Sequence, residues 1–204
     1  MKNPVNLTPF TKRILAVYDR AIPSDIVQGL EWYGEAQTQS RVLAKAYNLP
    51  LHVVVGVIAA LSPNNRWTRN IVDAENMLEA WHNGDGIETV TVCTYRPMRA
   101  KAWSILEQGP EVSIEQVRAI LNGQKIMAFF DCIAGLDACC IDGHAYNIAM
   151  GKRETLTSDK VNVTKKMFRD LQSCYSSAAK RRGITAYQMQ AVTWVAWRRE
   201  HNIT

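Results

Sequence analysis

The chain has 204 residues, of which 47% are hydrophobic and 21% charged, and this composition excludes an intrinsically disordered protein. Its formal net charge of +5 favours a polyanionic partner. Five cysteines without CxxC spacing give no disulfide framework, and the longest apolar run, residues 51–61, is too short to cross a bilayer. We therefore expect a cytoplasmic protein, monomeric and without membrane contact.

Helical patterns follow one another through the first half of the chain. Residues 24–47 place apolar side chains at helical spacing, with Ser24 as the N-cap. Residues 52–61 fit a buried helix or a buried strand by pattern, and we predict a helix because no partner strand is evident. Residues 66–84 form an amphipathic helix that Gly84 ends.

The second half of the chain is also helical in pattern, after a non-helical stretch at residues 85–97. Ser113 with Gln116 makes a capping box, and Thr185 with Gln188 caps a final helix that is apolar on most sides. Helices are predicted at 99–108, 113–121, 124–135, from 143 onward, at 164–183 and at 186–200. The sequence thus predicts an all-α protein of nine or ten helices.

A two-residue turn, Asn122-Gly123, joins two of these helices into a tight hairpin. Both residue types tolerate positive φ. Backbone amides at such a turn and at the following helix N-terminus can form a phosphate-sized anion site, with Lys125 one step inside. The alternative is an ordinary helical hairpin with a solvated lysine, because Asn-Gly turns are common where two helices meet.

An aspartate and a histidine lie two residues apart in the segment from Cys139 to Gly151. Asp142 most simply caps a helix that begins at Gly143 or His144. Its functional interpretation is a carboxylate behind apolar residues, able to stabilise positive charge or to accept a proton. The two roles are compatible, because a cap holds a carboxylate in one orientation.

A metal site is a third interpretation of the same segment. Zinc-type ligands occur within thirteen residues, at Cys132, Cys139, Cys140, Asp142 and His144. Adjacent cysteines rarely bind one ion, and the spacing matches neither paired CxxC motifs nor the HxE…PCxxC pattern. We therefore expect no metal and no other cofactor.

A polar turn follows the buried helix at residues 52–61. It carries Asn64, Asn65, Arg66 and Trp67. Amides, a guanidinium and an indole at one turn can stack on a base and hydrogen-bond its edge. The alternative is a capping turn whose tryptophan packs into the core.

Four motifs in order carry a resemblance to a known family: "LSPN" at 61–64, "KAWSIL" at 101–106, "LNGQKIMA" at 121–128 and "IDGHAYNIA" at 141–149. Together they resemble the helix-hairpin-helix (HhH-GPD, endonuclease III-like) DNA glycosylase superfamily. The closing "MQAVTWVAWRRE" is similar to the end of short, phage-encoded members. The resemblance implies one two-lobed helical domain spanning 1–204. One lobe covers about 51–122 with the hairpin at 115–135, and the other combines the N-terminal helices with 143–204.

In that family the hairpin holds the DNA backbone while a flipped nucleotide enters a cleft, where its base is removed. By resemblance, Asp142 stabilises the oxocarbenium-like sugar, and Lys125 is the candidate nucleophile for strand cleavage. Asn64 corresponds to the residue that fills the vacated space in the duplex. The full set of expected DNA contacts is Asn64, Asn65, Arg66, Trp67, Arg69, Asn122, Gly123, Gln124 and His144. The implied partner is double-stranded DNA, including modified phage DNA in the host cytoplasm if the protein is phage-encoded.

The sequence also departs from the family. Its hairpin is about two residues shorter and lacks a proline and a second glycine, and Asn147 replaces the arginine after the D-x-H motif. The four-cysteine iron–sulfur loop of some members is missing. Two alternatives therefore stay open beside base excision. One is a transferase of the same superfamily that modifies bases in phage DNA, and the other is a non-catalytic DNA- or protein-binding module.

Overall fold

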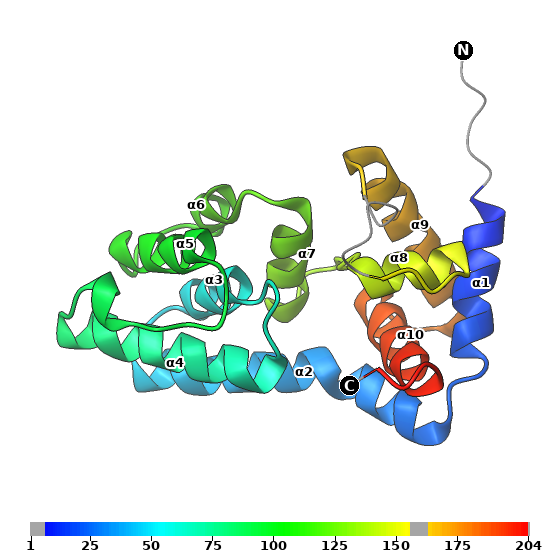
Figure 1. Ribbon diagram of the computed structural model, residues 1–204, viewed down its shortest axis with the longest axis horizontal. Coiled ribbons are helices and arrows are strands. Elements are labelled where there is room, and N and C mark those ends of the chain that lie inside the picture. Colours follow the sequence, from blue (N-terminus) through cyan, green and yellow to red (C-terminus); the bar gives the residue numbers. More distant parts are fainter. Residues whose placement is uncertain (1–6, 156–162, 204) are drawn as a thin grey trace, which may run out of the picture. The chain divides into compact units, whose positions relative to one another are not determined.

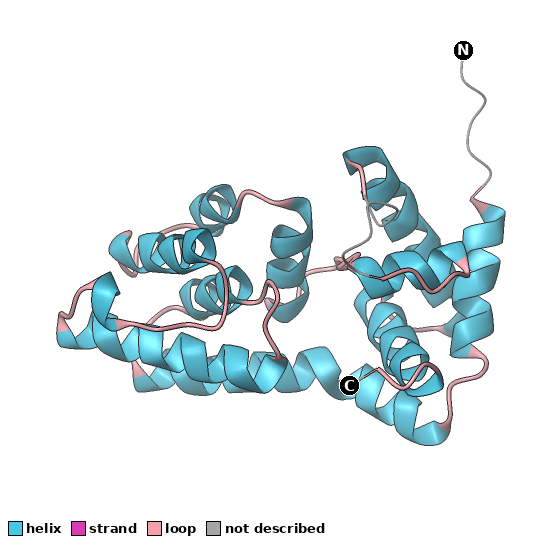
Figure 2. Ribbon diagram, in the orientation of Figure 1, coloured by secondary structure: helices cyan, strands magenta, loops and turns pink. Residues whose placement is uncertain are grey.

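The computed structural model describes residues 7–155 and 163–203. Within these ranges the chain forms ten α-helices, one 3₁₀-helix (η1) and no strand (Figure 2), which confirms the all-α prediction. The elements are α1 (Thr8–Tyr18), α2 (Pro23–Ala46), α3 (Leu51–Leu61), α4 (Trp67–Asn83), η1 (Ile87–Thr89), α5 (Arg96–Glu107), α6 (Ile114–Leu121), α7 (Gln124–Ile133), α8 (Gly143–Met150), α9 (Lys165–Arg182) and α10 (Ala186–Glu200).

Several helix ends follow the predicted signals. Gly84 ends α4 in the left-handed region, with φ of 78°. Complete capping boxes begin α6 at Ser113 with Gln116 and α10 at Thr185 with Gln188. In each box a side-chain oxygen accepts one free N–H of the first turn, so the start of the helix is encoded locally.

Two predicted starts are wrong. Helix α2 begins at Pro23 instead of after Ser24. Asp25, in its first turn, accepts the N–H of Ile22, the residue before the helix, at Oδ2 over 3.1 Å. Helix α5 begins at Arg96, three residues earlier than predicted, because proline at its second position is compatible with a first helical turn.

The chain divides into two compact units. Unit 1 contains residues up to Gly34 and from Leu136 onward, and unit 2 contains Glu35–Gly135. In unit 1, α1, α8 and α9 all pack against α10 (Figure 1). In unit 2, α3 is the central helix and contacts α4, α5, α6 and α7.

Helix α3 is the core of unit 2. Every residue from Val53 to Leu61 is buried, which explains its continuous apolar sequence. Gly56 permits a close approach to α6, because a Cβ there would lie 2.6 Å from Cγ1 of Val117. Within the described ranges, no single helix has the length and apolar composition to cross a bilayer; α2 and α3 reach those limits only together, across a bend of 118°.

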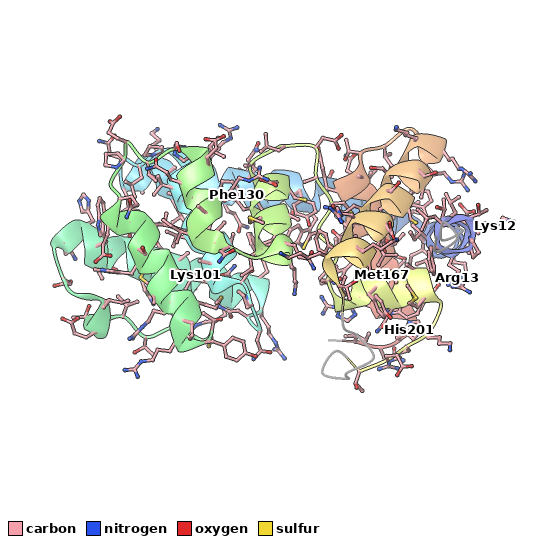
Figure 3. All side chains as sticks on the ribbon, turned by 90° about the horizontal axis from the view of Figure 1, so that it is seen from above. Lys12, Arg13, Lys101, Phe130, Met167 and His201 are labelled. Atoms are coloured by element: carbon pink, nitrogen blue, oxygen red, sulfur yellow. The ribbon has the colours of Figure 1, made fainter. Side chains whose placement is uncertain are left out.

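Unit 1 is held together by close packing and by surface ion pairs. Gly29 of α2 lies against the backbone of α10, where a Cβ would be 2.4 Å from Cα of Val192. Three ion pairs join the corner between α1 and α2 to the C-terminal ends of α9 and α10: Arg20–Glu200, Arg199–Asp25 and Arg182–Asp19. Lys12 and Arg13 of α1 are both exposed (Figure 3), and Nη1 of Arg13 donates to the carbonyl of Ala149 on α8 at 3.3 Å.

Candidate functional site

Asp142 is the N-cap of α8 in unit 1, as the sequence predicts. Its backbone is extended, and its Oδ1 accepts the N–H of Ala145 at 2.7 Å. The residue is half-buried. No other hydrogen bond or ion pair engages the carboxylate within the described part of the chain. One oxygen is therefore fixed by the helix, and the other has no partner among the described residues.

The cysteines before Asp142 line the interior of unit 1. Cys139, Cys140 and Ile141 expose 2%, 5% and 2% of their surface. Across the described residues, no group of three His, Cys, Asp or Glu side chains is placed to hold a metal ion. Cys93 of unit 2 is the one exposed cysteine of the five.

His144 is the second residue of α8 and is half-buried. Its ring meets the indole of Trp194 edge to face, with centroids 6.4 Å apart. The guanidinium of Arg198 lies 4.4 Å from the centroid of the same indole. The beginning of α8 is thus bordered by an aromatic ring that already carries a cation on it, a surface compatible with stacking and with negative charge.

Asn147 takes the position where the resembled family has arginine, and it is 1% exposed. Its Nδ2 donates to the carbonyl of Glu154 at 2.7 Å, which fixes the loop after α8. Its Oδ1 has no hydrogen-bond partner among the residues that the structure describes. Asn147 therefore holds the protein's own backbone.

The predicted hairpin is present in unit 2. Helix α6 ends at Leu121, Asn122 adopts the left-handed region with φ of 40° and ψ of 56°, and α7 begins at Gln124. Gly123 is extended, with φ of −166°, and a Cβ there would come no closer than 3.8 Å to any neighbour. Both residue types tolerate a positive φ, but only Asn122 adopts one here.

Basic side chains surround this hairpin. Lys101 of α5 (Figure 3) donates to the carbonyl of Leu121, the last residue of α6, and so satisfies a free carbonyl. Arg118 lies 3.0 Å from Oδ1 of Asp131 on α7. Burial raises the pKa of Asp131, and the charge of Arg118 only partly opposes this. Lys125 is exposed at the second position of α7.

The polar turn after α3 contacts the hairpin. Trp67, the first residue of α4, is half-buried and meets the ring of Phe129 on α7 edge to face at 6.4 Å. Asn64 is exposed and adopts a positive φ of 55°, and Arg66 is also exposed. The Nδ2 of Asn65 donates to the carbonyl of Leu61 and is occupied inside the protein. Unit 2 thus brings this turn and α7 together.

Lys125 and Asp142 belong to different units, so the prediction that they face one cleft stays a prediction. A family model described as "Family of unknown function (DUF7178)" matches residues 1–201. The chain belongs to this family. Searches of curated proteins and of solved structures gave no match.

The DUF7178 chain contains a structural carboxylate that sequence reasoning missed. Asp73 of α4 is fully buried and accepts three hydrogen bonds, from Nδ2 of Asn65 at 2.9 Å, Nε of Arg69 at 2.7 Å and the N–H of Cys93 at 2.8 Å. Next to it, the Thr94 hydroxyl donates to the carbonyl of Pro63 at 2.6 Å. The spacing of Arg69 and Asp73 on one helical face was the available signal.

Two open pockets lie on unit 2, and neither contains Asp142 or Lys125. The larger, of about 560 Å³, lies where α2 meets α3, and the smaller, of about 360 Å³, borders the hairpin on its α6 side. The smaller pocket is lined by Glu115, Arg118, Ala119, Asn122 and Met127. Because its walls carry both signs of charge, its composition selects neither anions nor cations.

Proposed function

We propose that this DUF7178 protein is a DNA glycosylase-type enzyme with the two-lobed fold of the helix-hairpin-helix superfamily, acting on a flipped base in double-stranded DNA. The observation that carries the proposal is the fixed orientation of the Asp142 carboxylate at the start of α8. The Ala145 N–H holds one oxygen of a half-buried carboxylate, and within the described residues the other is uncommitted. Groups held in advance where charge develops provide electrostatic catalysis without reorganisation.

In the proposed reaction the N-glycosidic bond breaks, and the base leaves with its electron pair and takes up a proton. Positive charge then develops on the sugar, and the Asp142 carboxylate stabilises it. Water adds to C1′ and loses a proton to solvent. The carboxylate itself forms no bond, so it has to be fixed and ionised, and a helix N-terminus favours negative charge.

Lys125 supplies a second mode of the same chemistry. In this mode its amine, instead of water, forms the bond to C1′, and the resulting Schiff base permits strand cleavage. Its exposed position at the start of α7, one residue from the predicted phosphate contacts at Asn122, Gly123 and Gln124, supports this role. The remaining DNA contacts are proposed at His144, at Arg69 and at the polar turn after α3, here called the Asn64 turn (Asn64, Asn65, Arg66 and Trp67).

The charge of the protein is concentrated in unit 1. This unit contains 15 lysines and arginines against 9 acidic residues, a net +6, whereas unit 2 contains 9 against 10, a net −1. A polyanion is therefore attracted mainly to unit 1, which also contains Asp142. DNA affinity should fall steeply with salt, because each neutralised phosphate adds about −0.9 to the slope of log K against log salt concentration.

The direct test is release of free base from duplexes carrying uracil, 5-hydroxymethyluracil, alkylated purines or oxidised purines. Asp142→Asn should abolish release while melting temperature and DNA affinity stay at their wild-type values. Asp137→Asn is the matched control, since Asp137 is an exposed acid five residues earlier. Full activity in a folded Asp142→Asn variant would exclude the proposed role of the carboxylate.

Borohydride reduction tests the lysine. A covalent DNA adduct should form with the wild type and disappear in Lys125→Ala, whereas the exposed Lys152→Ala control should keep it. Salt-dependent DNA binding without release of any base would instead indicate a binding module. Modified nucleosides in DNA exposed to the protein, detected by mass spectrometry, would indicate a transferase.

A further inference from the structure

Helix α9 hydrogen-bonds the backbone on both sides of Asp142, at two residues that are equally far from it along the chain. The Nε2 of Gln172 donates to the carbonyl of Cys139 at 2.9 Å. The hydroxyl of Tyr175 donates to the carbonyl of Ala145 at 3.2 Å. Cys139 precedes Asp142 by three residues and Ala145 follows it by three, so the two bonds bracket the carboxylate.

Gln172 and Tyr175 are themselves three residues apart, so they share one face of α9. Tyr175 is 0% exposed, and Gln172 is half-buried. Burial, reinforced by the nearby Cys139 and Asp142, raises the pKa of Tyr175 well above its ordinary value, with Thr193 opposing. The raised pKa keeps the hydroxyl protonated at neutral pH, so it can donate to the Ala145 carbonyl.

Ala145 connects this bracket to the acid. Its N–H donates to Oδ1 of Asp142, while its carbonyl accepts from Tyr175. The two atoms belong to neighbouring peptide groups joined at the Ala145 Cα, so a displacement of Ala145 moves the donor that orients the carboxylate. The Gln172 bond fixes the other end, where the chain enters the cap. A side chain with locked neighbours keeps its geometry during a reaction, and a misplacement of about 1 Å costs roughly 100-fold in rate.

We propose that Gln172 and Tyr175 are positioning residues. They set the orientation of the Asp142 carboxylate through hydrogen bonds to the backbone on either side of it. The catalytic consequence rests on the proposed function. The effect of the two hydrogen bonds on the backbone around Asp142 does not rest on it, because these bonds are present in the folded chain without substrate. The two parts can therefore be tested separately.

The first experiment needs no substrate and follows hydrogen exchange of the Ala145 amide by NMR. Tyr175→Phe should accelerate its exchange about tenfold, and the double variant Gln172→Ala/Tyr175→Phe should accelerate it further, with amides of α10 unchanged. Ser177→Ala, a half-buried change on the same helix, is the control and should have no effect. Wild-type protection of Ala145 in a folded double variant would overturn the proposal.

A double-mutant cycle separates positioning of the carboxylate from general support of α8. In an Asp142→Ala background the Ala145 N–H has lost its acceptor, so Tyr175→Phe should cause no further acceleration. A merely structural role predicts the same acceleration in both backgrounds, and that result would also count against the proposal.

The second experiment measures single-turnover base release with the substrate that the wild type accepts. Tyr175→Phe should lower the rate about tenfold and leave the dissociation constant for DNA unchanged. An unchanged rate with altered Ala145 exchange would overturn the catalytic part alone. If the wild type releases no base, the proposed function fails, and the exchange measurements still decide whether the bracket exists.

Discussion

The Nε atom of Arg69 lies 2.7 Å from Oδ1 of Asp73, although the Asp73 side chain is fully buried and 46% of the Arg69 side chain is exposed. The carboxylate also accepts from Asn65 and Cys93. The pair is therefore asymmetric. Water can replace the arginine, whereas nothing can replace the acid at the centre of three donors.

Asp73→Ala should lower the free energy of unfolding by about 3 kcal/mol, because buried donors lose their acceptor. Arg69→Ala should cost much less, since the exposed guanidinium is screened by water and its partner keeps two other hydrogen bonds. Urea denaturation of both variants measures the difference. Equal losses would mean that the ion pair alone, and not the set of three donors, stabilises the turn.

Asp131 gives a pH-dependent prediction. Burial raises its pKa in the folded protein, with Arg118 opposing, so the folded state binds the proton more tightly than the unfolded state. Its ionisation is therefore destabilising as pH rises through the folded pKa. Asp131→Asn should stabilise the protein at pH 7, and the difference should disappear near and below about pH 3.9, the usual aspartate value. Denaturation curves between pH 3 and 7 test this; destabilisation by the variant at pH 7 would show that the Arg118 ion pair dominates.

Two glycines of α2 should respond in opposite ways to alanine. A Cβ on Gly29 would lie 2.4 Å from the backbone of Val192, whereas a Cβ on Gly34 would meet nothing within 4 Å. Gly29→Ala should cost about 3 kcal/mol through overpacking, and Gly34→Ala should be neutral or stabilise by up to about 1 kcal/mol. Thermal melts of the two variants compare them directly, and a tolerated Gly29→Ala would contradict the close packing of α2 on α10.

Gly123 has no steric reason to be glycine. Its φ of −166° suits any residue, and a Cβ would clear its neighbours. If the glycine serves close approach of a phosphate, Gly123→Ala should leave the melting temperature within about 1 °C and weaken DNA binding about tenfold. The exposed Gly84→Ala is a poor control, since its φ is positive; the exposed Ala119→Ser on α6 is the better one. Undiminished binding by Gly123→Ala would remove the hairpin from the DNA interface.

Sequence reasoning succeeded where the signal is local. The capping boxes at Ser113 and Thr185 and the cap at Asp142 each involve groups within one helical turn. For α3 the local pattern fitted a helix and a strand equally well. The helix was predicted correctly only because no other segment of the chain looked like a partner strand. The Ser24 cap was wrong because Pro23 suits the first turn of a helix and Asp25, in that same turn, accepts the N–H of Ile22, so α2 begins before Ser24.

Long-range partners could not be predicted. Nothing near Asp142 indicates that Tyr175, 33 residues later, holds the following turn, and nothing near Pro63 indicates the hydroxyl of Thr94. Such contacts depend on how helices pack, which periodicity does not specify. Gln172 did carry a weak signal, as a polar side chain between the buried Leu171 and Tyr175 on α9.

Cys93 has a practical consequence. It is the one exposed thiol among five, and its backbone N–H is anchored to the buried Asp73, while the next residue is bonded to Pro63. A maleimide dye or a nitroxide attached there would report from a rigid point beside the Asn64 turn, without any cysteine having to be removed. The natural sequence thus provides a single attachment point for a spectroscopic probe of ligand binding at that turn.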